Sequence, residues 1–127
     1  MRRVFKTRTF HRWMRKTGLS DACLADAIAE MEQGLIDADL GGHVVKKRVA
    51  IAARGKRGGA RTLIGTNFQD RWFFLFGFGK NERNNVDRDE LGALQEIART
   101  LLALHDAQIE TAIADGELLE ISNGNQT

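Results

Sequence analysis

Basic side chains gather in the middle third of this chain, where residues 43–83 contain 10 basic and 2 acidic residues and carry a net charge of +8. Residues 1–42 carry +1 and residues 84–127 carry −7, within a total of +2. Such a concentration of cations predicts a polyanionic partner, although a solvated face is the simpler alternative. All of these basic residues except Arg71 are candidates to bind such a partner, namely Lys46, Lys47, Arg48, Arg54, Lys56, Arg57, Arg61, Lys80 and Arg83.

These side chains could bind RNA, and they could also cleave it without a metal ion. Arginine meets a phosphate group with two parallel hydrogen bonds, and lysine meets it as a point charge. Cleavage requires the 2′-hydroxyl to lose a proton, the phosphorane charge to be neutralised and the 5′-oxygen to be protonated. An arginine can neutralise the charge of the phosphorane. A lysine whose pKa is lowered by like charges can take the proton from the 2′-hydroxyl or give one to the 5′-oxygen. Charge alone does not separate cleavage from binding of RNA or DNA.

Other kinds of catalysis have no signature in the sequence. The basic loop at residues 54–59 lacks the G-x-x-x-x-G-K-[ST] pattern of a phosphate-binding loop, and residues 77–80 lack the third glycine of a dinucleotide site. No G-x-S-x-G elbow occurs, and Cys23 falls within a predicted apolar helix. The three histidines are scattered and form no pair with ligand spacing, so the sequence predicts no metal and no other cofactor.

Two short helices are predicted near the start of the chain, after a strand at residues 4–7. Thr9 can cap the first helix and Gly18 can end it, while Ser20 can cap the second and Gly34 can end that one. The pair is expected to form a helical hairpin. Apolar spacing of three and four gives each helix a face to bury, made of Phe10, Trp13 and Met14 in the first and of Leu24, Ala27, Ile28 and Met31 in the second.

Three further strands are predicted at residues 44–51, 60–66 and 72–76. Alternation in the first puts Lys47 among apolar residues on one face, with Lys46 and Arg48 on the other. Residues 72–76 are apolar throughout, which is typical of a central strand covered on both sides. The basic loop therefore joins two strands that carry cations.

A long helix is predicted to begin at Asp87 or Asp89 and to end near Gly116. This order predicts an α+β fold with a small, mostly antiparallel four-stranded sheet, an N-terminal helical hairpin and a long C-terminal helix. We expect one domain at residues 1–121 and a disordered tail at 122–127. No apolar run suits a membrane span or secretory signal, and the lone cysteine fits a reducing compartment, so a cytoplasmic protein is expected.

Five segments in this order resemble toxins of the RelE/HigB family, and more narrowly those of the HigB branch, over roughly residues 1–106. No single segment is diagnostic, and the specificity comes from the combination. The segments are Gly18-Leu19-Ser20-Asp21, Asp37-Ala38-Asp39-Leu40-Gly41-Gly42, Lys46-Lys47-Arg48-Val49-Ala50, Gly55-Lys56-Arg57-Gly58-Gly59-Ala60-Arg61 and Phe76-Gly77-Phe78-Gly79-Lys80-Asn81-Glu82-Arg83.

The resemblance implies a microbial-ribonuclease-like sheet, an antitoxin that occludes it, expected to be a helix-turn-helix protein, and cleavage of messenger RNA in the ribosomal A site. Because no residues in the sequence have metal-ligand spacing, we expect this cleavage to be independent of metal ions. It also implies that Lys46 and Arg48 act at the scissile phosphate and that Arg61 stabilises the transition state. The family's Gly-Lys-x-x-Arg stretch corresponds to Gly79, Lys80 and Arg83. The cations expected only to bind RNA are Lys47, Arg54, Lys56 and Arg57.

The chain departs from this family at two positions. Asn81 follows Lys80 where well-characterised members have an arginine, and Asp87 stands where they have a tyrosine. Lys80, Arg83, His43 and a C-terminal group are the candidates for the general acid, with Lys80 ranked first. Two other functions stay open, namely inhibition of DNA gyrase, as in ParE-like toxins on the same fold, and nucleic-acid binding without cleavage by a phage-derived protein.

Overall fold

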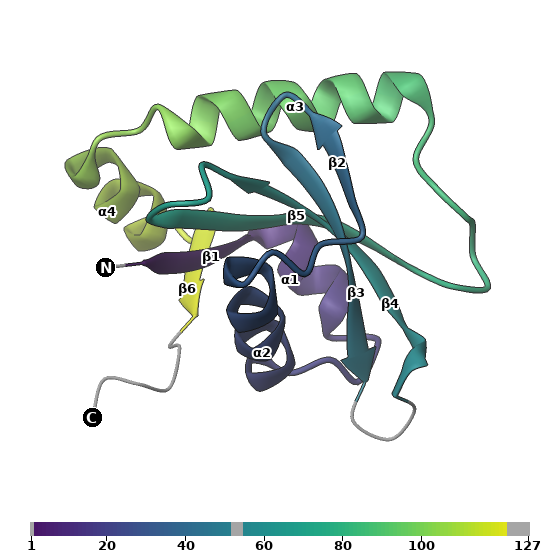
Figure 1. Ribbon diagram of the computed structural model, residues 1–127. Helices are drawn as coiled ribbons and strands as arrows, with labels where there is room; N and C mark the ends of the chain where they lie inside the picture. The colour runs from purple at the N-terminus through teal and green to yellow at the C-terminus, as the bar shows by residue number, and fades with distance from the viewer. Residues whose placement is uncertain (1, 52–54, 122–127) are drawn as a thin grey trace.

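The computed structural model describes residues 2–51 and 55–121, and for residues 55–58 it describes the backbone alone. Within these residues one six-stranded sheet carries helices on both faces, which confirms the predicted α+β class (Figure 1). The elements in chain order are β1 (Arg3–Thr7), α1 (Arg8–Met14), α2 (Asp21–Glu32), β2 (Ala38–Gly41), β3 (Val44–Ile51), β4 (Gly55–Thr66), β5 (Arg71–Gly79), α3 (Arg88–Leu102), α4 (Asp106–Ala114) and β6 (Leu118–Ile121).

The strands lie in the order β2-β3-β4-β5-β1-β6. Neighbours from β2 to β5 are antiparallel, whereas β1 runs parallel to β5 and antiparallel to β6. The predicted count of four strands is wrong, because β2 and β6 each add a four-residue strand at one edge. Both are short and lie beside turn-forming glycines, so their sequences indicate a turn and a helix end rather than strands.

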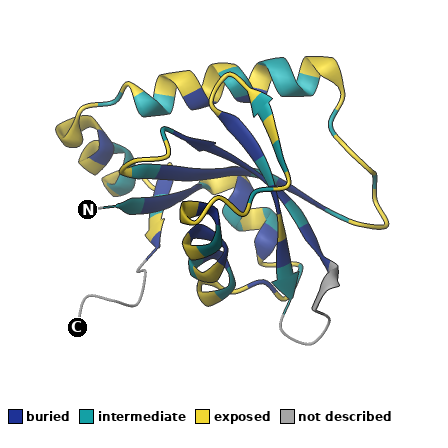
Figure 2. Cartoon of the chain, in the orientation of Figure 1, coloured by how far each residue is buried: buried dark blue, intermediate teal, exposed yellow. Residues whose placement is uncertain are grey.

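Each face of the sheet carries its own hydrophobic core. On one face α1 and α2 cover a cluster that includes Phe10, Ile28 and Phe74, and on the other α3 and α4 cover Phe73 and Ile109. Buried residues concentrate in the central strands, while the outward sides of the helices are exposed (Figure 2). β5 is buried on both faces, as its apolar sequence predicts.

The two N-terminal helices begin at polar caps and bury their apolar faces against the sheet. Ser20 Oγ accepts a hydrogen bond from the Cys23 N–H, which confirms the predicted cap of α2. α1 starts earlier than predicted, because Thr7 rather than Thr9 accepts from the Phe10 N–H. The predicted helical hairpin is wrong in detail, since α1 packs mainly on β5 and α2 on β3.

The predicted long C-terminal helix is in fact two helices. Asp87 begins α3 with a capping box, in which its side chain accepts from the Glu90 N–H and the Glu90 carboxylate accepts from the Asp87 N–H. This confirms one of the two predicted starts. Arg71 of β5 fixes the break after α3, because its guanidinium donates to the Leu104 carbonyl and pairs with Asp106 at 2.9 Å. A residue distant in sequence therefore ends a helix that local periodicity would extend.

Two glycines of the sheet let a helix approach closely. A Cβ atom at Gly77 in β5 would lie 2.3 Å from ring atom Cζ3 of Trp13 in α1. A Cβ atom at Gly65 in β4 would lie 2.9 Å from Cβ of Ala98 in α3. Neither position has room for a side chain, so these glycines set how closely α1 and α3 pack on the two faces.

Two buried lysines attach α2 to the sheet. Lys6 of β1 pairs with Asp21 Oδ1 at 2.6 Å, and Lys47 of β3 pairs with Glu30 Oε1 at 2.7 Å. Lys47 also donates to the Leu35 carbonyl at 2.7 Å. Both lysine side chains are only 5% exposed. Because a buried charge without a partner is costly, these two pairs fix both ends of α2 on their strands.

Replacement of Lys47 with methionine should lower the free energy of unfolding by about 2 kcal/mol, because the ion pair with Glu30 and the hydrogen bond to the Leu35 carbonyl are both lost. The estimate is below that for a fully buried pair, since the Glu30 side chain is 34% exposed. Lys46→Met is the matched control, and it should change stability by about 0.5 kcal/mol or less. Urea denaturation of both variants makes the comparison, and equal stabilities would contradict the assigned role of Lys47.

Candidate active site

Three cations lie together on the face of the sheet that α3 covers in part. Alternation along β3 puts Lys46 and Arg48 on the same side as Val44, which belongs to the core beneath α3. Arg61 of β4 is directly opposite Arg48, and Leu63 is opposite Lys46. Strand pairing therefore brings together three of the predicted site residues.

The paired residues Arg48 and Arg61 belong to a row of side chains that crosses neighbouring strands of the sheet. Arg48 in β3 is opposite Arg61 in β4, which is opposite Phe78 in β5. Asp37, just before β2, flanks Arg48, and Arg83, beyond the end of β5, lies over the Phe78 ring. We call this group the basic band, and its members are Asp37, Lys46, Arg48, Arg61, Phe76, Phe78, Arg83 and Glu90.

Asp37 holds Arg48 at one end of the basic band. The Arg48 backbone N–H donates to Asp37 Oδ2 at 2.6 Å, and the Arg48 Nε donates to Oδ1 at 3.4 Å. The Asp37 N–H donates in turn to the Lys46 carbonyl at 2.9 Å. The Arg48 side chain is still 49% exposed. Its guanidinium is therefore oriented by a carboxylate and remains accessible to a phosphate group.

Glu90 and two aromatic rings hold Arg83 at the other end. Arg83 Nη1 donates to Glu90 Oε2 at 2.8 Å, and Nη2 donates to Oε1. The guanidinium carbon lies 5.8 Å from the ring centres of both Phe76 and Phe78. Because Glu90 also belongs to the capping box of α3, one carboxylate orients Arg83 and stabilises the start of the helix.

Arg61, in the middle of the basic band, has no such partner. Within the described part of the chain it forms no ion pair or side-chain hydrogen bond, and its Nη1 is buried without an acceptor. Lys46 is also unpaired among these residues. A buried donor without an acceptor costs about 1–3 kcal/mol, and like charges directly opposite each other are unfavourable. An oxyanion at Arg61 would relieve both costs.

Lys47 is not part of the basic band. It lies on the opposite face of the sheet, as the alternation predicts, and its ammonium binds Glu30 and the Leu35 carbonyl. With only 5% of its side chain exposed, it cannot reach an RNA strand without breaking these bonds. The expectation that Lys47 binds RNA is therefore corrected to a role in attaching α2.

Lys80 is separated from the basic band as well. It lines a cavity on the α1 side of the sheet together with Trp13 and Ala60. The turn after β5 therefore puts Lys80 and Arg83 on opposite faces, although the two residues belong to one sequence motif.

Arg54 and the side chains of Lys56 and Arg57 lie outside the described residues, so their RNA-binding role stays a prediction.

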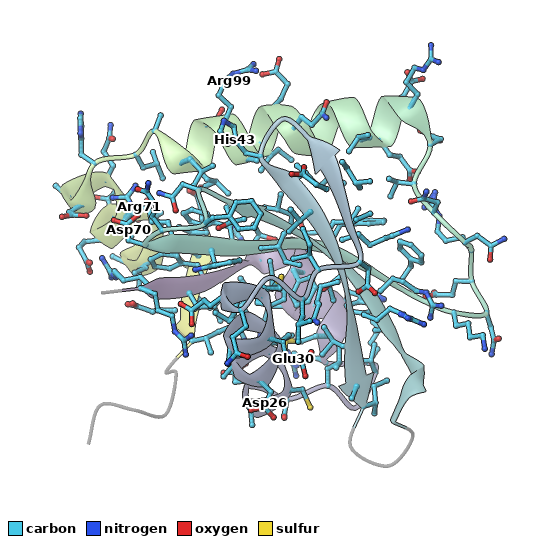
Figure 3. All side chains as sticks on the ribbon, in the orientation of Figure 1. Asp26, Glu30, His43, Asp70, Arg71 and Arg99 are labelled. Carbon is cyan, nitrogen blue, oxygen red and sulfur yellow. The ribbon has the colours of Figure 1, made fainter. Side chains whose placement is uncertain are left out.

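His43, a candidate for the general acid, lies at the far end of β3 from Arg48. It forms the turn between β2 and β3, has a φ of 69°, and lies beside α3 (Figure 3). Arg48 is five positions further along the extended chain, roughly 16 Å away. Of the other candidates, Arg83 lies in the basic band, Lys80 does not, and the C-terminal group is outside the described residues.

The carboxylates that orient Arg48 and Arg83 are members of the candidate site that the sequence did not reveal as such. Glu90 had a detectable signal, because Asp87-x-x-Glu90 has the spacing of a capping box. Asp37 had none, since it meets Arg48 only through the pairing of β2 with β3. Strands bring such partners together across sequence gaps that periodicity does not encode.

The described residues contain no cluster of three or more His, Cys, Asp or Glu side chains placed to hold a metal ion. Among the same residues, no helix has the length and apolar character needed to cross a membrane.

The pKa of His11 in α1 is lowered, first by burial and then by the nearby charges of Lys6 and Arg15. His11 belongs to the α1 side of the sheet, so this shift does not bear on the basic band.

A small α+β domain that presents unpaired cations across neighbouring strands is suited to contact with a polyanion. The chain belongs to the RelE toxin family, since the model described as RelE toxin of RelE / RelB toxin-antitoxin system matches residues 2–121. The predicted RelE-type toxin is thus confirmed at the level of the family. Toxins of this family pair with an antitoxin and are generally endoribonucleases. No curated protein matches the chain.

Replacement of Arg61 with methionine should raise the free energy of unfolding by about 0.5–1 kcal/mol, because it removes an unsatisfied donor and the repulsion with Arg48. Millimolar phosphate should raise the Tm of the wild type more than that of Arg61→Met, with sodium chloride at equal ionic strength as the control. Thermal denaturation measures both effects. If Arg61→Met is less stable and responds to phosphate like the wild type, Arg61 is a structural residue.

Proposed function

We propose that this toxin cleaves messenger RNA on the ribosome, without a metal ion, and thereby inhibits translation. The observation that carries the proposal is the buried Nη1 of Arg61, which has no partner in the part of the chain that the structure describes and lies between two arginines that carboxylates already orient. Three guanidinium groups along one line fit a phosphodiester with neighbouring phosphates. The band therefore supports phosphate chemistry better than contact with a neutral partner.

Each cation of the band has a distinct task in the proposed reaction. Arg61 neutralises the charge that develops on the scissile phosphate, because a group fixed on a strand needs no reorganisation. Arg48 and Arg83 hold the flanking backbone. Lys46 carries the proton, because guanidinium groups do not deprotonate in proteins. Its amine takes the 2′-hydroxyl proton while the 2′-oxygen bonds to phosphorus, and it returns that proton to the 5′-oxygen as the P–O5′ bond breaks.

The partners of the proposed function are messenger RNA on the ribosome and an antitoxin of the helix-turn-helix type, as in the HigB branch. Action on ribosome-bound messages requires the cytoplasm. An antitoxin that covers the basic band would block the phosphate-binding arginines directly. The exposed half of Arg48 offers a contact that both the RNA and an acidic antitoxin side chain could use.

Replacement of Arg61 with alanine should lower kcat by about 100-fold or more, the usual loss for one preorganised electrostatic group. Arg61→Lys should recover only part of the rate, because an ammonium lacks the two-pronged geometry. Arg99→Ala is the control, since Arg99 lies on the outward side of α3 and pairs there with Glu96 (Figure 3). Single-turnover cleavage on programmed ribosomes gives the rates.

The same variants separate the alternatives in cells. Expression of the wild type without an antitoxin should produce cuts within translated messages, mapped by primer extension, and Arg61→Ala should produce none. Broken DNA with intact messages would instead indicate gyrase inhibition. Normal cleavage by Arg61→Ala would move the reaction centre away from the basic band.

Cleavage should continue at an unchanged rate after a chelator such as EDTA has removed divalent ions from the toxin. The reason is that the proposed chemistry assigns charge neutralisation to Arg61 and proton transfer to Lys46, which leaves no task for a metal. Because ribosomes need magnesium, the toxin is treated and desalted before it is mixed with programmed ribosomes. Loss of cleavage that one added transition metal restores would contradict the assignment.

A further inference from the structure

A cavity of about 660 Å³ opens on the α1 side of the sheet, behind the basic band. It lies between the C-terminal end of α1, the paired ends of β3 and β4, and the turn that follows β5. Cavities that bind small molecules commonly measure about 300–1,000 Å³. Among its lining residues are Trp13, Lys16, Ala60, Lys80, Asn81 and Glu82.

An indole ring forms one wall of this cavity. Trp13 lies on Gly77 of β5, where any side chain would collide with the ring, and its ring centre is 5.4 Å from that of Phe10. These contacts fix the plane of the indole, and yet the residue remains partly exposed. A fixed, partly exposed indole is a surface on which a nucleobase can stack.

Two lysines line the same cavity as the indole. Lys16 lies three residues after Trp13, in the turn that follows α1, and Lys80 comes from the turn after β5. Both are exposed, and within the described ranges neither forms an ion pair or a side-chain hydrogen bond. The carboxylate of the lining, Glu82, accepts a hydrogen bond from the Gly79 N–H. The cavity thus combines an aromatic wall with two uncommitted positive charges, which suits a base with its phosphate.

We propose that this cavity binds a nucleotide of the RNA strand adjacent to the cleavage position, with the base on Trp13 and the phosphate between Lys16 and Lys80. The inference rests on the proposed ribonuclease function and extends it to a second RNA-binding site. The side-chain amide of Asn81 offers both a donor and an acceptor to the base edge.

The two sites are close along the chain, although they lie on opposite faces. Ala60 of the cavity wall precedes Arg61 directly, and it is opposite Gly79, the last residue of β5. β4 continues to Gly55, so its residues 55–59 extend past the last β5 pairing. An RNA strand bound at Arg61 can therefore pass around the end of β5, with Arg83 on one side of the turn and Lys80 on the other.

Tryptophan fluorescence reports on this cavity directly. The chain has two tryptophans, and Trp72 is fully buried in the core, so a change in emission on ligand binding comes from Trp13. Titration with AMP, GMP, CMP and UMP should quench the wild type, and the signal should be lost in Trp13→Phe. Lys16→Glu and Lys80→Glu should each weaken binding about tenfold or more. Arg12→Glu, with the same charge change at an exposed α1 position outside the lining, should bind within about twofold of the wild type.

Cleavage assays then separate this site from the basic band. Arg61→Ala should lose cleavage and keep the fluorescence titration, whereas Lys16→Glu should raise the half-saturating ribosome concentration about tenfold and leave the saturated rate unchanged.

If no mononucleotide quenches the wild type, or if Lys16→Glu is quenched equally, the cavity is not a nucleotide site. Weakened nucleotide binding with normal half-saturation would assign the cavity to free nucleotides and overturn the RNA assignment. Loss of antitoxin binding alone would make it a protein contact.

Discussion

The ion pair between Lys47 and Glu30 fixes which way β3 faces, and the basic band depends on that choice. Side chains alternate along a strand, so a buried Lys47 on the α2 side requires Lys46 and Arg48 to point to the other side. A register slip of one residue would bury two cations without partners and expose the third. The pairing with β4 then places Arg61 opposite Arg48. The Lys47–Glu30 salt bridge thus specifies the face on which Lys46, Arg48 and Arg61 appear.

The basic band is not equally cationic along its length. Asp37 orients Arg48 and Glu90 orients Arg83, so each terminal arginine is partly neutralised before any ligand arrives. Among the described residues, Arg61 receives no such compensation and keeps a buried unsatisfied donor. The environment of Arg61 is therefore most favourable when an anion is present. Such a group stabilises a transition state that carries extra negative charge more than it stabilises the ground state. Arg61 therefore lowers the stability of the fold, while Asp37 and Glu90 reduce the repulsion by partly neutralising Arg48 and Arg83.

Sequence reasoning succeeded where the signal is local. The caps at Ser20 and Asp87, the alternation in β3 and the apolar β5 each depend on neighbours within a few residues. It failed where the determinant is distant. Arg71 breaks the C-terminal helix from another strand, and short edge strands gain their stability from pairing rather than from composition. Within the candidate site, the charge pattern of the sequence indicated the cations. It did not indicate which carboxylates pair with them, or that the cations are divided between the two faces of the sheet.

The position of Asp87 explains why proton transfer falls to Lys46 in the proposed reaction. The toxins that the sequence resembles have a tyrosine at this place, whereas Asp87 here caps α3 through the Glu90 N–H. Its carboxylate accepts this hydrogen bond, and Glu90 accepts one from the Asp87 N–H while binding Arg83. The capping box is therefore coupled to the orientation of a band arginine, and a proton donor at residue 87 would disturb both. Position 87 is thus used for structure, guanidinium groups do not exchange protons, and the Asp37 and Glu90 carboxylates are engaged by Arg48 and Arg83. Lys46 is therefore the residue of the band left to carry a proton between the two ribose oxygens in the proposed reaction.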